Sequence, residues 1–223
     1  ERALAGVCSR CRDKAAAAKA LAAAVASSSA RVRRNLMRVC GQLGGEDALD
    51  VLASGAQDDD EDVREAAVGA LSSSRDVRAS ERLLKIARTG AKPEHRTAAL
   101  RGYIRAMRYR EQAPEKKLWL YLQVLDLAQR PDEKKLALDG LGDIKTLGAM
   151  KFALEQIYSP EVKDSAAYAA CRVARHLYET HPEEVRQAMQ TVLQVTEDEN
   201  TAKEARRILG LVKPASTKPS PKP

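Results

Sequence analysis

Aromatic residues are scarce in this sequence. They make up 4% of its 223 residues, with one Phe, one Trp and six Tyr, although hydrophobic residues as a whole reach 44%. The apolar content is therefore mostly Ala, Leu and Val. Side chains of this size let helices pack closely but suit a β-sheet poorly. The composition predicts a helical protein.

Long hydrophobic runs are also missing. No stretch approaches the roughly 20 apolar residues that a membrane-spanning helix needs. The most apolar segment, residues 15–26, is short and Ala-rich, and it follows Arg12, Asp13 and Lys14. We interpret it as a buried or half-buried helix and expect no membrane insertion.

Recognisable catalytic patterns are absent. The sequence has no Gly-x-Ser-x-Gly elbow and no phosphate-binding loop after a strand. Its three histidines, His95, His176 and His181, are scattered and form no paired metal-binding motif. We therefore predict no enzymatic activity, no catalytic residues and no cofactor.

The four cysteines do not form a metal site by their spacing. Cys8 and Cys11 make one Cys-x-x-Cys pair, and a structural zinc site would need two more suitably spaced ligands. A disulfide between these two is an alternative for an exported protein, although a continuous helix would hold them in poor geometry. Cys40 and Cys171 fall on the expected inner faces of helices, so we predict buried thiols there.

What the sequence does contain is an internal repeat. Several segments share an acidic or Pro-containing start, an aligned, mostly aliphatic position, a basic residue and then an Ala-rich stretch. The aligned positions are Val32, Val63, His95, Glu133, Val162 and, in a weaker copy, Thr201. They are separated by 31, 32, 38, 29 and 39 residues, a period typical of helix–turn–helix solenoids.

Each repeat can be divided into two helices. Pro93, Pro131 and Pro160 suit the first turn of the second helices, where a missing N–H is tolerated. The first helices are expected near residues 14–26, 77–88, 115–128, 148–158 and 182–195. Trp119 falls on one of them, and we interpret it as a packing residue. The pattern predicts an all-α solenoid of about six stacked antiparallel helix pairs.

This repeat domain is expected over residues 1–212. Residues 213–223 are rich in Pro, Lys and Ser with almost no apolar content, so we expect a disordered linker or tail. The sequence starts at Glu1, and the repeat register places this start inside a helix. We interpret the chain as a fragment of a larger multi-domain protein.

The repeat resembles a known family. The start Asp62-Val63-Arg64, the Ala-rich helix after it and the end Leu141-Gly142 of another copy are similar to the second helix of a HEAT repeat. They are also similar to the short repeats of phycobilisome lyase-type proteins. Residues 99–103 and 130–135 resemble HEAT modules of large secreted or periplasmic bacterial proteins. That resemblance implies a periplasmic or secreted location.

One face of the second helices is the predicted binding surface. Positions two and six residues after each aligned position are mostly polar and share a helix face, and in stacked pairs this helix usually lines the concave side. Arginine can bind carboxylates or phosphates with two hydrogen bonds, and tyrosine is a rigid anchor. The candidate binding residues on the concave face are Arg34, Arg38, Arg101 and Tyr168 at these positions, and Arg105 and Arg172 one helical turn further along.

A second set of basic residues recurs immediately after the aligned positions. We predict that it connects adjacent repeats rather than binding a partner. Its members are Arg33, Arg64, Arg96, Lys134 and Lys163.

These observations predict a non-catalytic scaffold that binds a protein or peptide, or a neighbouring domain of its own chain. The alternative is a domain that binds polyanions or nucleic acid, including a DNA glycosylase-like role. The net charge of +7 favours that alternative, but three of the lysines lie in the tail, and the acidic run at residues 58–62 opposes it. Aromatic platforms for bases are also nearly absent.

Overall fold

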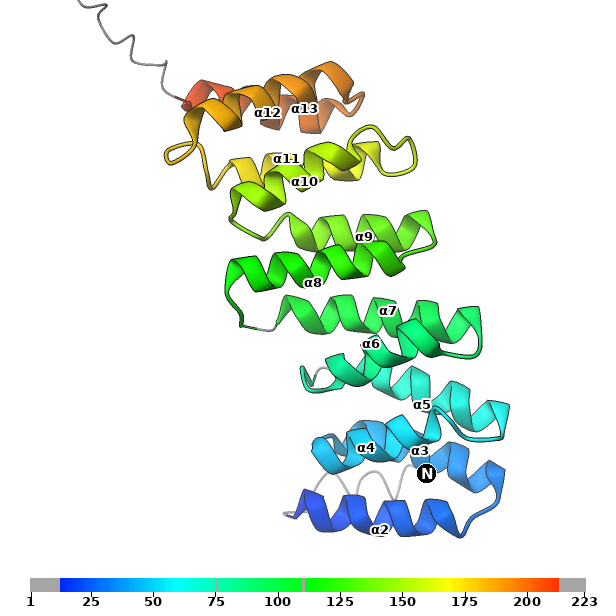
Figure 1. Cartoon of the computed structure of the whole chain (residues 1–223). Coiled ribbons are helices and arrows are strands. Elements are labelled where there is room, and N and C mark those ends of the chain that lie inside the picture. The colour runs from blue at the N-terminus through cyan, green and yellow to red at the C-terminus, as the bar shows by residue number, and fades with distance from the viewer. Residues whose placement is uncertain (1–12, 75, 110, 213–223) are drawn as a thin grey trace, which may run out of the picture. The chain divides into compact units, whose positions relative to one another are not determined.

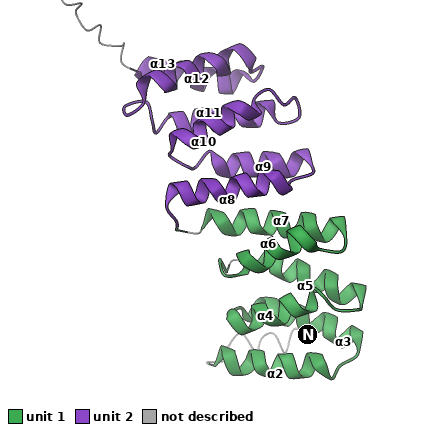
Figure 2. Ribbon diagram, in the orientation of Figure 1, with its two compact units in different colours: residues 1–111 green, residues 112–223 purple. Residues whose placement is uncertain are grey.

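The computed structural model describes residues 13–74, 76–109 and 111–212, and these residues form helices without any strand (Figure 1). The chain divides into two compact units, residues 1–111 and 112–223 (Figure 2). The all-helical prediction is confirmed for this part of the chain. The predicted tail at 213–223 and the pair Cys8 and Cys11 lie outside it.

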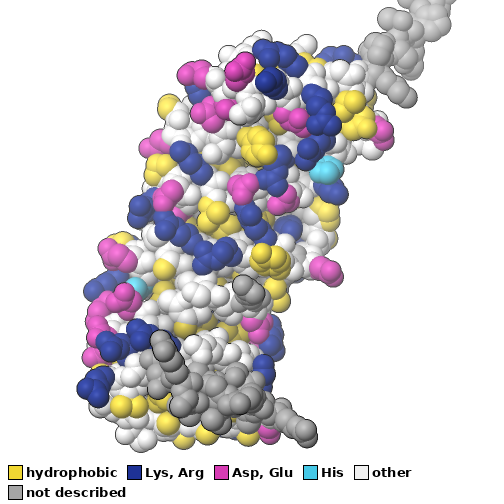
Figure 3. Space-filling view, turned by 180° about the vertical axis from the view of Figure 1, so that it is seen from behind, with side chains coloured by type: hydrophobic (Ala, Val, Ile, Leu, Met, Phe, Trp, Pro, Cys, Tyr) yellow, Lys and Arg dark blue, Asp and Glu magenta, His cyan; other side chains and the backbone are white. Residues whose placement is uncertain are grey.

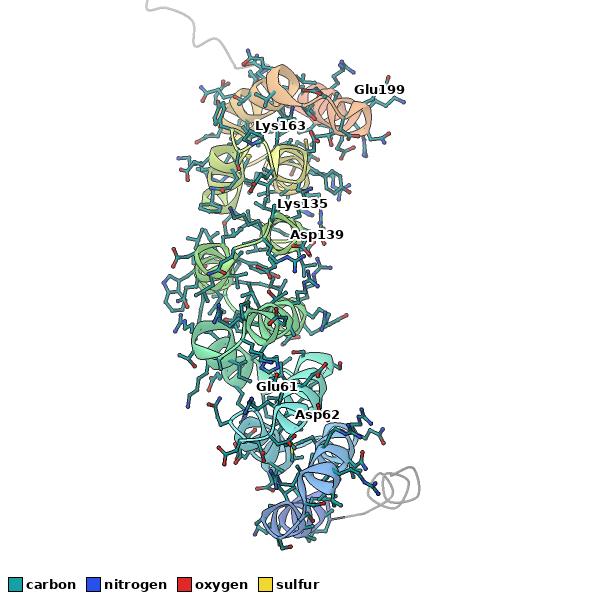
Figure 4. The ribbon with its side chains drawn as sticks, turned by 90° about the vertical axis from the view of Figure 1, so that its right-hand side faces the viewer. Glu61, Asp62, Lys135, Asp139, Lys163 and Glu199 are labelled. Carbon is teal, nitrogen blue, oxygen red and sulfur yellow. The ribbon has the colours of Figure 1, made fainter. Side chains whose placement is uncertain are left out.

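The described residues of the first unit form three helix pairs. They are α2 (Lys14–Ala26) with α3 (Ala30–Leu43), α4 (Glu46–Gly55) with α5 (Glu61–Ser73), and α6 (Ala79–Thr89) with α7 (Pro93–Arg108). The second helices α3, α5 and α7 pack side by side in one layer, and α2 and α4 pack together in the other. Figure 4 looks along the helices and shows the two layers.

The second unit repeats this arrangement. Its pairs are α8 (Pro114–Leu127) with α9 (Pro131–Leu141), α10 (Leu147–Gln156) with α11 (Lys163–Ala174), and α12 (Pro182–Val195) with α13 (Glu199–Leu211). Here α11 packs against both α9 and α13, while α10 packs against α8 and α12. Each unit is thus a short α-solenoid, and the described helices of the two units form six pairs, in agreement with the predicted number of about six.

Local sequence signals set most of the helix starts. Asp60 and Asp198 each cap a helix by accepting a backbone N–H, from Val63 at 3.2 Å and from Thr201 at 2.7 Å. Prolines occupy the first turns of α7, α8, α9 and α12. The hydrogen bonds that Thr201 donates also hold the pKa of Asp198 below its usual value.

The prediction for Pro160 was wrong. α11 begins at Lys163, and Pro160 lies in a turn that the Val162 N–H closes by donating to the Ser159 carbonyl at 3.1 Å. Proline is favoured at the second position of such turns because its fixed φ fits there. Pro160 therefore precedes the helix instead of starting it.

The core is built from small and medium side chains, and glycines bring helices into close contact. A Cβ added to Gly102 of α7 would lie 2.7 Å from the Cα of Ser72 on α5. Cys40 and Cys171 are buried free thiols, as predicted. Burial raises the pKa of Cys171 to about 12, so this thiol stays protonated inside the second unit.

The interpretation of Trp119 as a packing residue was wrong, because this residue is 57% exposed. The neighbouring positions Leu120, Tyr121 and Val124 supply the buried face of α8. Trp119 therefore lies on the outer side of its helix, and the closely packed core of the second unit is built without it.

Candidate functional site

The six predicted binding residues lie on second helices in both units. Arg34 and Arg38 are on α3, Arg101 and Arg105 on α7, and Tyr168 and Arg172 on α11. Four of them therefore belong to the first unit and two to the second.

A groove with a volume of about 540 Å³ lies between α3 and α5 in the first unit. Helix α3 contributes Arg34, Arg38, Gly41 and Gln42 to its lining. Helix α5 contributes Asp62, Glu65, Ala66, Gly69, Ala70 and Ser73. Two of the predicted binding residues, Arg34 and Arg38, thus line a cavity of the size that ligand sites usually have.

Small residues form the floor of the groove. The two helices approach closely where a Cβ added to Gly41 would lie 2.9 Å from the Cβ of Ala70. A Cβ added to Gly69 would have no neighbour within 4 Å, so the space directly above this exposed residue is open. Gly69 itself contributes no side chain that would keep a partner's backbone away from α5.

The two sides of the groove carry opposite charge. The α3 side presents Arg34 and Arg38, and the α5 side presents Asp62 and Glu65. Arg34 Nη1 pairs with Asp62 Oδ2 at 3.1 Å, at one end of the groove. One turn further along, Arg38 and Glu65 are both exposed to solvent. The groove can thus offer a cation and a carboxylate to the same ligand.

Arg105 makes a contact inside the fold. Its Nη2 donates to the carbonyl oxygen of Ser72 at 2.6 Å, in the last turn of α5. A cation there also interacts favourably with the negative end of the helix dipole. Arg101, one turn earlier on α7, is partly exposed.

Arg172 and Tyr168 form a pre-arranged pair in the second unit. Arg172 Nη1 donates to the carbonyl and the carboxylate of Asp139 at 2.9 and 2.6 Å, and its Nη2 pairs with Asp143. The guanidinium lies 5.9 Å from the centroid of the Tyr168 ring, within cation–π range. The ring is 50% exposed and is therefore a supported aromatic surface.

The prediction that a recurring base connects adjacent repeats is confirmed at three positions. Arg33 pairs with Asp58 at 2.7 Å, Lys134 with Glu161 at 3.9 Å and Lys163 with Glu197 at 2.7 Å. In each case the acid belongs to the segment preceding the next second helix. The pKa of Lys163 is raised and that of Glu197 lowered, mainly by the hydrogen bond between them.

The prediction was wrong for Arg64 and Arg96. These two bind carbonyl oxygens of the loop before their own helix, at Asp58 and Gly90, because that loop ends with acceptors in reach of the first turn. At the start of α7 the link back to α5 comes instead from its N-cap residue Lys92, which pairs with Glu61 at 2.7 Å. Lys92 and Arg64 together lower the pKa of Glu61 to about 2.

Sequence reasoning did not select the acidic side of the groove. Glu65 and Gly69 occupy the same repeat positions as Arg34 and Arg38, so the register contained this signal. Asp62 lies outside those positions, and its place in the acidic start of the repeat indicated a helix start rather than a binding residue. Figure 4 shows it at the start of α5.

The described side chains offer little evidence for a metal site or for a surface that binds polyanions. Across residues 13–74, 76–109 and 111–212, no group of three His, Cys, Asp or Glu side chains is placed to hold a metal ion. On the face that Figure 3 shows, basic and acidic side chains are interspersed. None of the described helices is long and apolar enough to cross a membrane.

Comparison with known proteins identifies the repeats of the first unit. Residues 14–103 match the sequence model of HEAT repeats, which confirms that resemblance for the part of the chain containing the groove. HEAT repeats generally serve as non-catalytic scaffolds for protein interactions. No curated protein matches the chain.

A solved structure supports the fold. The crystal structure of an engineered protein is similar to this chain with a TM-score of 0.52 and 17% sequence identity, covering 87% of this chain and 96% of that one. At this identity the similarity concerns the fold alone.

Proposed function

We propose that this HEAT-repeat chain is a non-catalytic scaffold that binds a polypeptide segment in the groove between α3 and α5. The observation that carries the proposal is the pairing of a small-residue floor with opposite charges on the two sides. A polypeptide can present a narrow backbone to the floor and side chains of both signs to the sides. Few other ligands combine these properties.

The same charges disfavour the alternative of polyanion binding. A strand of phosphates would meet the carboxylates of Asp62 and Glu65 a short distance from the arginines that attract it. Binding driven by phosphates would also weaken steeply as salt rises, because it depends on the release of counterions. Binding in the groove should depend less on salt.

The other predicted residues extend the proposed binding face in each unit. Tyr168, held against Arg172, offers a rigid aromatic contact of the kind enriched at the centre of interfaces. Arg101 and Arg105 occupy the second-helix layer of the first unit. Arg105 already binds the carbonyl oxygen of Ser72, so a partner would have to share its guanidinium with that contact.

The test uses the open space at Gly69. Gly69→Met would place a side chain into the groove, and its Cβ would have no neighbour within 4 Å. Gly210→Met is the matched control, because Gly210 is also an exposed helical glycine with nothing within 4 Å of an added Cβ. A random peptide library displayed on phage would be selected on the unmodified chain and then assayed on both variants.

We expect the selected peptides to lose binding to Gly69→Met and to keep it with Gly210→Met. Equal binding to both variants would show that the groove is not the site. The polyanion alternative would be favoured if the protein is retained on a heparin column, if Gly69→Met does not change this retention, and if moderate salt abolishes it.

A further inference from the structure

The dimensions of the groove limit the length of its ligand. Along α3 the lining runs from Arg34 to Gln42, which is about 12 Å at the helical rise of about 1.5 Å per residue. An extended peptide advances about 3.3 Å per residue. The groove therefore holds about four residues of an extended segment.

The floor and the far end are neutral. Ala66, Gly69 and Ala70 provide no large apolar surface, so the groove has no pocket for a bulky anchor residue. Gln42 and Ser73 lie at the end away from the Arg34–Asp62 pair, and both can exchange hydrogen bonds with a peptide backbone. Selectivity must then come from the charged middle of the groove.

That middle consists of Arg38 on one side and Glu65 on the other. In an extended peptide, consecutive side chains point in opposite directions. A segment lying along the groove with its side chains toward the two helices would send residue i to α3 and residue i+1 to α5. Neighbouring residues of opposite charge fit this arrangement, with the acid at Arg38 and the base at Glu65.

Building on the proposed function, we infer that the groove selects an extended segment of about four residues in which an acidic and a basic residue are adjacent, flanked by small residues. Two adjacent acids would place one carboxylate against Glu65 and Asp62. Two adjacent bases would place one cation against Arg34 and Arg38. An acid and a base separated by one residue would point to the same side, where only one can be matched.

Four short labelled peptides test the inference on the full chain. They carry the core sequences Ala-Glu-Lys-Ala, Ala-Glu-Glu-Ala, Ala-Lys-Lys-Ala and Glu-Ala-Lys-Ala between glycines, with blocked ends. Dissociation constants would be measured by NMR titration. We expect Ala-Glu-Lys-Ala to bind about tenfold or more tightly than the other three, because juxtaposed like charges are costly at an interface.

Two variants should change this preference in opposite directions. Arg38→Glu makes both sides acidic at this level, so Ala-Lys-Lys-Ala should become the tightest ligand. Glu65→Arg makes both sides basic, so Ala-Glu-Glu-Ala should become the tightest. Both residues are exposed, so the variants should fold, and circular dichroism would verify this.

The outcomes separate this inference from the proposed function. Peptide binding that is lost in Gly69→Met but shows no preference among the four peptides would overturn the charge rule and leave the groove as the site. Binding that ignores Gly69→Met altogether would overturn both. The inference and the proposed function would both be supported by three results together. These are a preference for adjacent opposite charges, the expected change of preference in each charge variant, and loss of binding in Gly69→Met.

Discussion

Arg105 donates from Nη2 to the carbonyl oxygen of Ser72 at 2.6 Å and so joins the last turn of α5 to α7. Arg172 makes the same kind of bond to the carbonyl of Asp139, joining α9 to α11 in the other unit. Both arginines lie ten residues after the aligned position of their repeat, at His95 and Val162. An arginine at this position therefore connects successive second helices in each unit.

Arg172→Ala should destabilise the second unit. The change removes hydrogen bonds and ion pairs to Asp139 and Asp143 from a side chain that is only 21% exposed. Hydrogen bonds to charged groups contribute about 1.5–3 kcal/mol each when a partner is deleted. Contact with solvent reduces the contribution of the Arg172 bonds, because Asp139 and Asp143 are partly exposed. We expect a loss of about 1–3 kcal/mol in the free energy of unfolding, measured by urea denaturation.

Arg175→Ala is the control for this prediction. Arg175 pairs with Glu204 at 3.6 Å, but its side chain is 48% exposed, and exposed pairs contribute about 0–1 kcal/mol. A loss as large as that of Arg172→Ala would show that the position of Arg172 in the repeat is not what matters.

Two glycines of the first unit should respond to alanine with opposite signs. In Gly102→Ala the new Cβ would lie 2.7 Å from the Cα of Ser72, so α5 and α7 must move apart, at a cost of about 1–3 kcal/mol. In Gly69→Ala nothing lies within 4 Å, and alanine's better helix propensity should stabilise α5 by about 0.5–1 kcal/mol. Hydrogen exchange of the α5 amides would measure the change in stability in each variant. Changes of the same sign in the two variants would contradict the packing argument.

The fold could be predicted because its signals are local and repeated. Proline or an acidic cap, a basic residue and an Ala-rich stretch recur, and the expected helices at 14–26 and 182–195 match α2 and α12 in the structure. Pro160 was placed wrongly because proline suits both a helix start and a β-turn. Only the hydrogen bond between Val162 and Ser159 distinguishes the two.

The candidate site could be predicted only in part. Periodicity identifies the face on which Arg38 and Arg105 lie, but it does not reveal that Arg105 binds a backbone carbonyl of the preceding repeat. Such an acceptor has no side-chain signature. The groove likewise depends on the close approach of Gly41 to Ala70, a contact between repeats that no single helix pattern contains.

Acid should weaken the first unit through Glu61. Lys92 and Arg64 lower the pKa of Glu61 to about 2, from 4.5 for the free side chain. A carboxyl with a lowered pKa contributes stability that is fully present above the unfolded value and is lost as pH falls through the folded value. The free energy of unfolding should therefore decrease as pH drops from about 5 to 2.

Glu61→Gln should reduce this pH dependence, and unfolding free energies from pH 7 to 2 would measure the difference. The pKa of Asp58 is also lowered, by its hydrogen bond with Arg33. Asp58 should therefore leave a smaller residual dependence of the unfolding free energy on pH in the variant. An unchanged slope would mean that the pairs of Glu61 with Lys92 and Arg64 do not stabilise the folded state.

Trp119 provides a final test of how this core is built. Because it is 57% exposed, acrylamide should quench its fluorescence efficiently in the native protein, and it is the sole Trp. Trp119→Ala should change the free energy of unfolding by no more than about 0.5 kcal/mol, as surface substitutions usually do. Tyr121→Ala, which empties a fully buried position on the same helix, should cost about 3–5 kcal/mol, as large aromatic truncations in cores do. If Trp119→Ala costs as much as Tyr121→Ala, then Trp119 contributes to packing in spite of its exposure, as its interpretation as a packing residue expects.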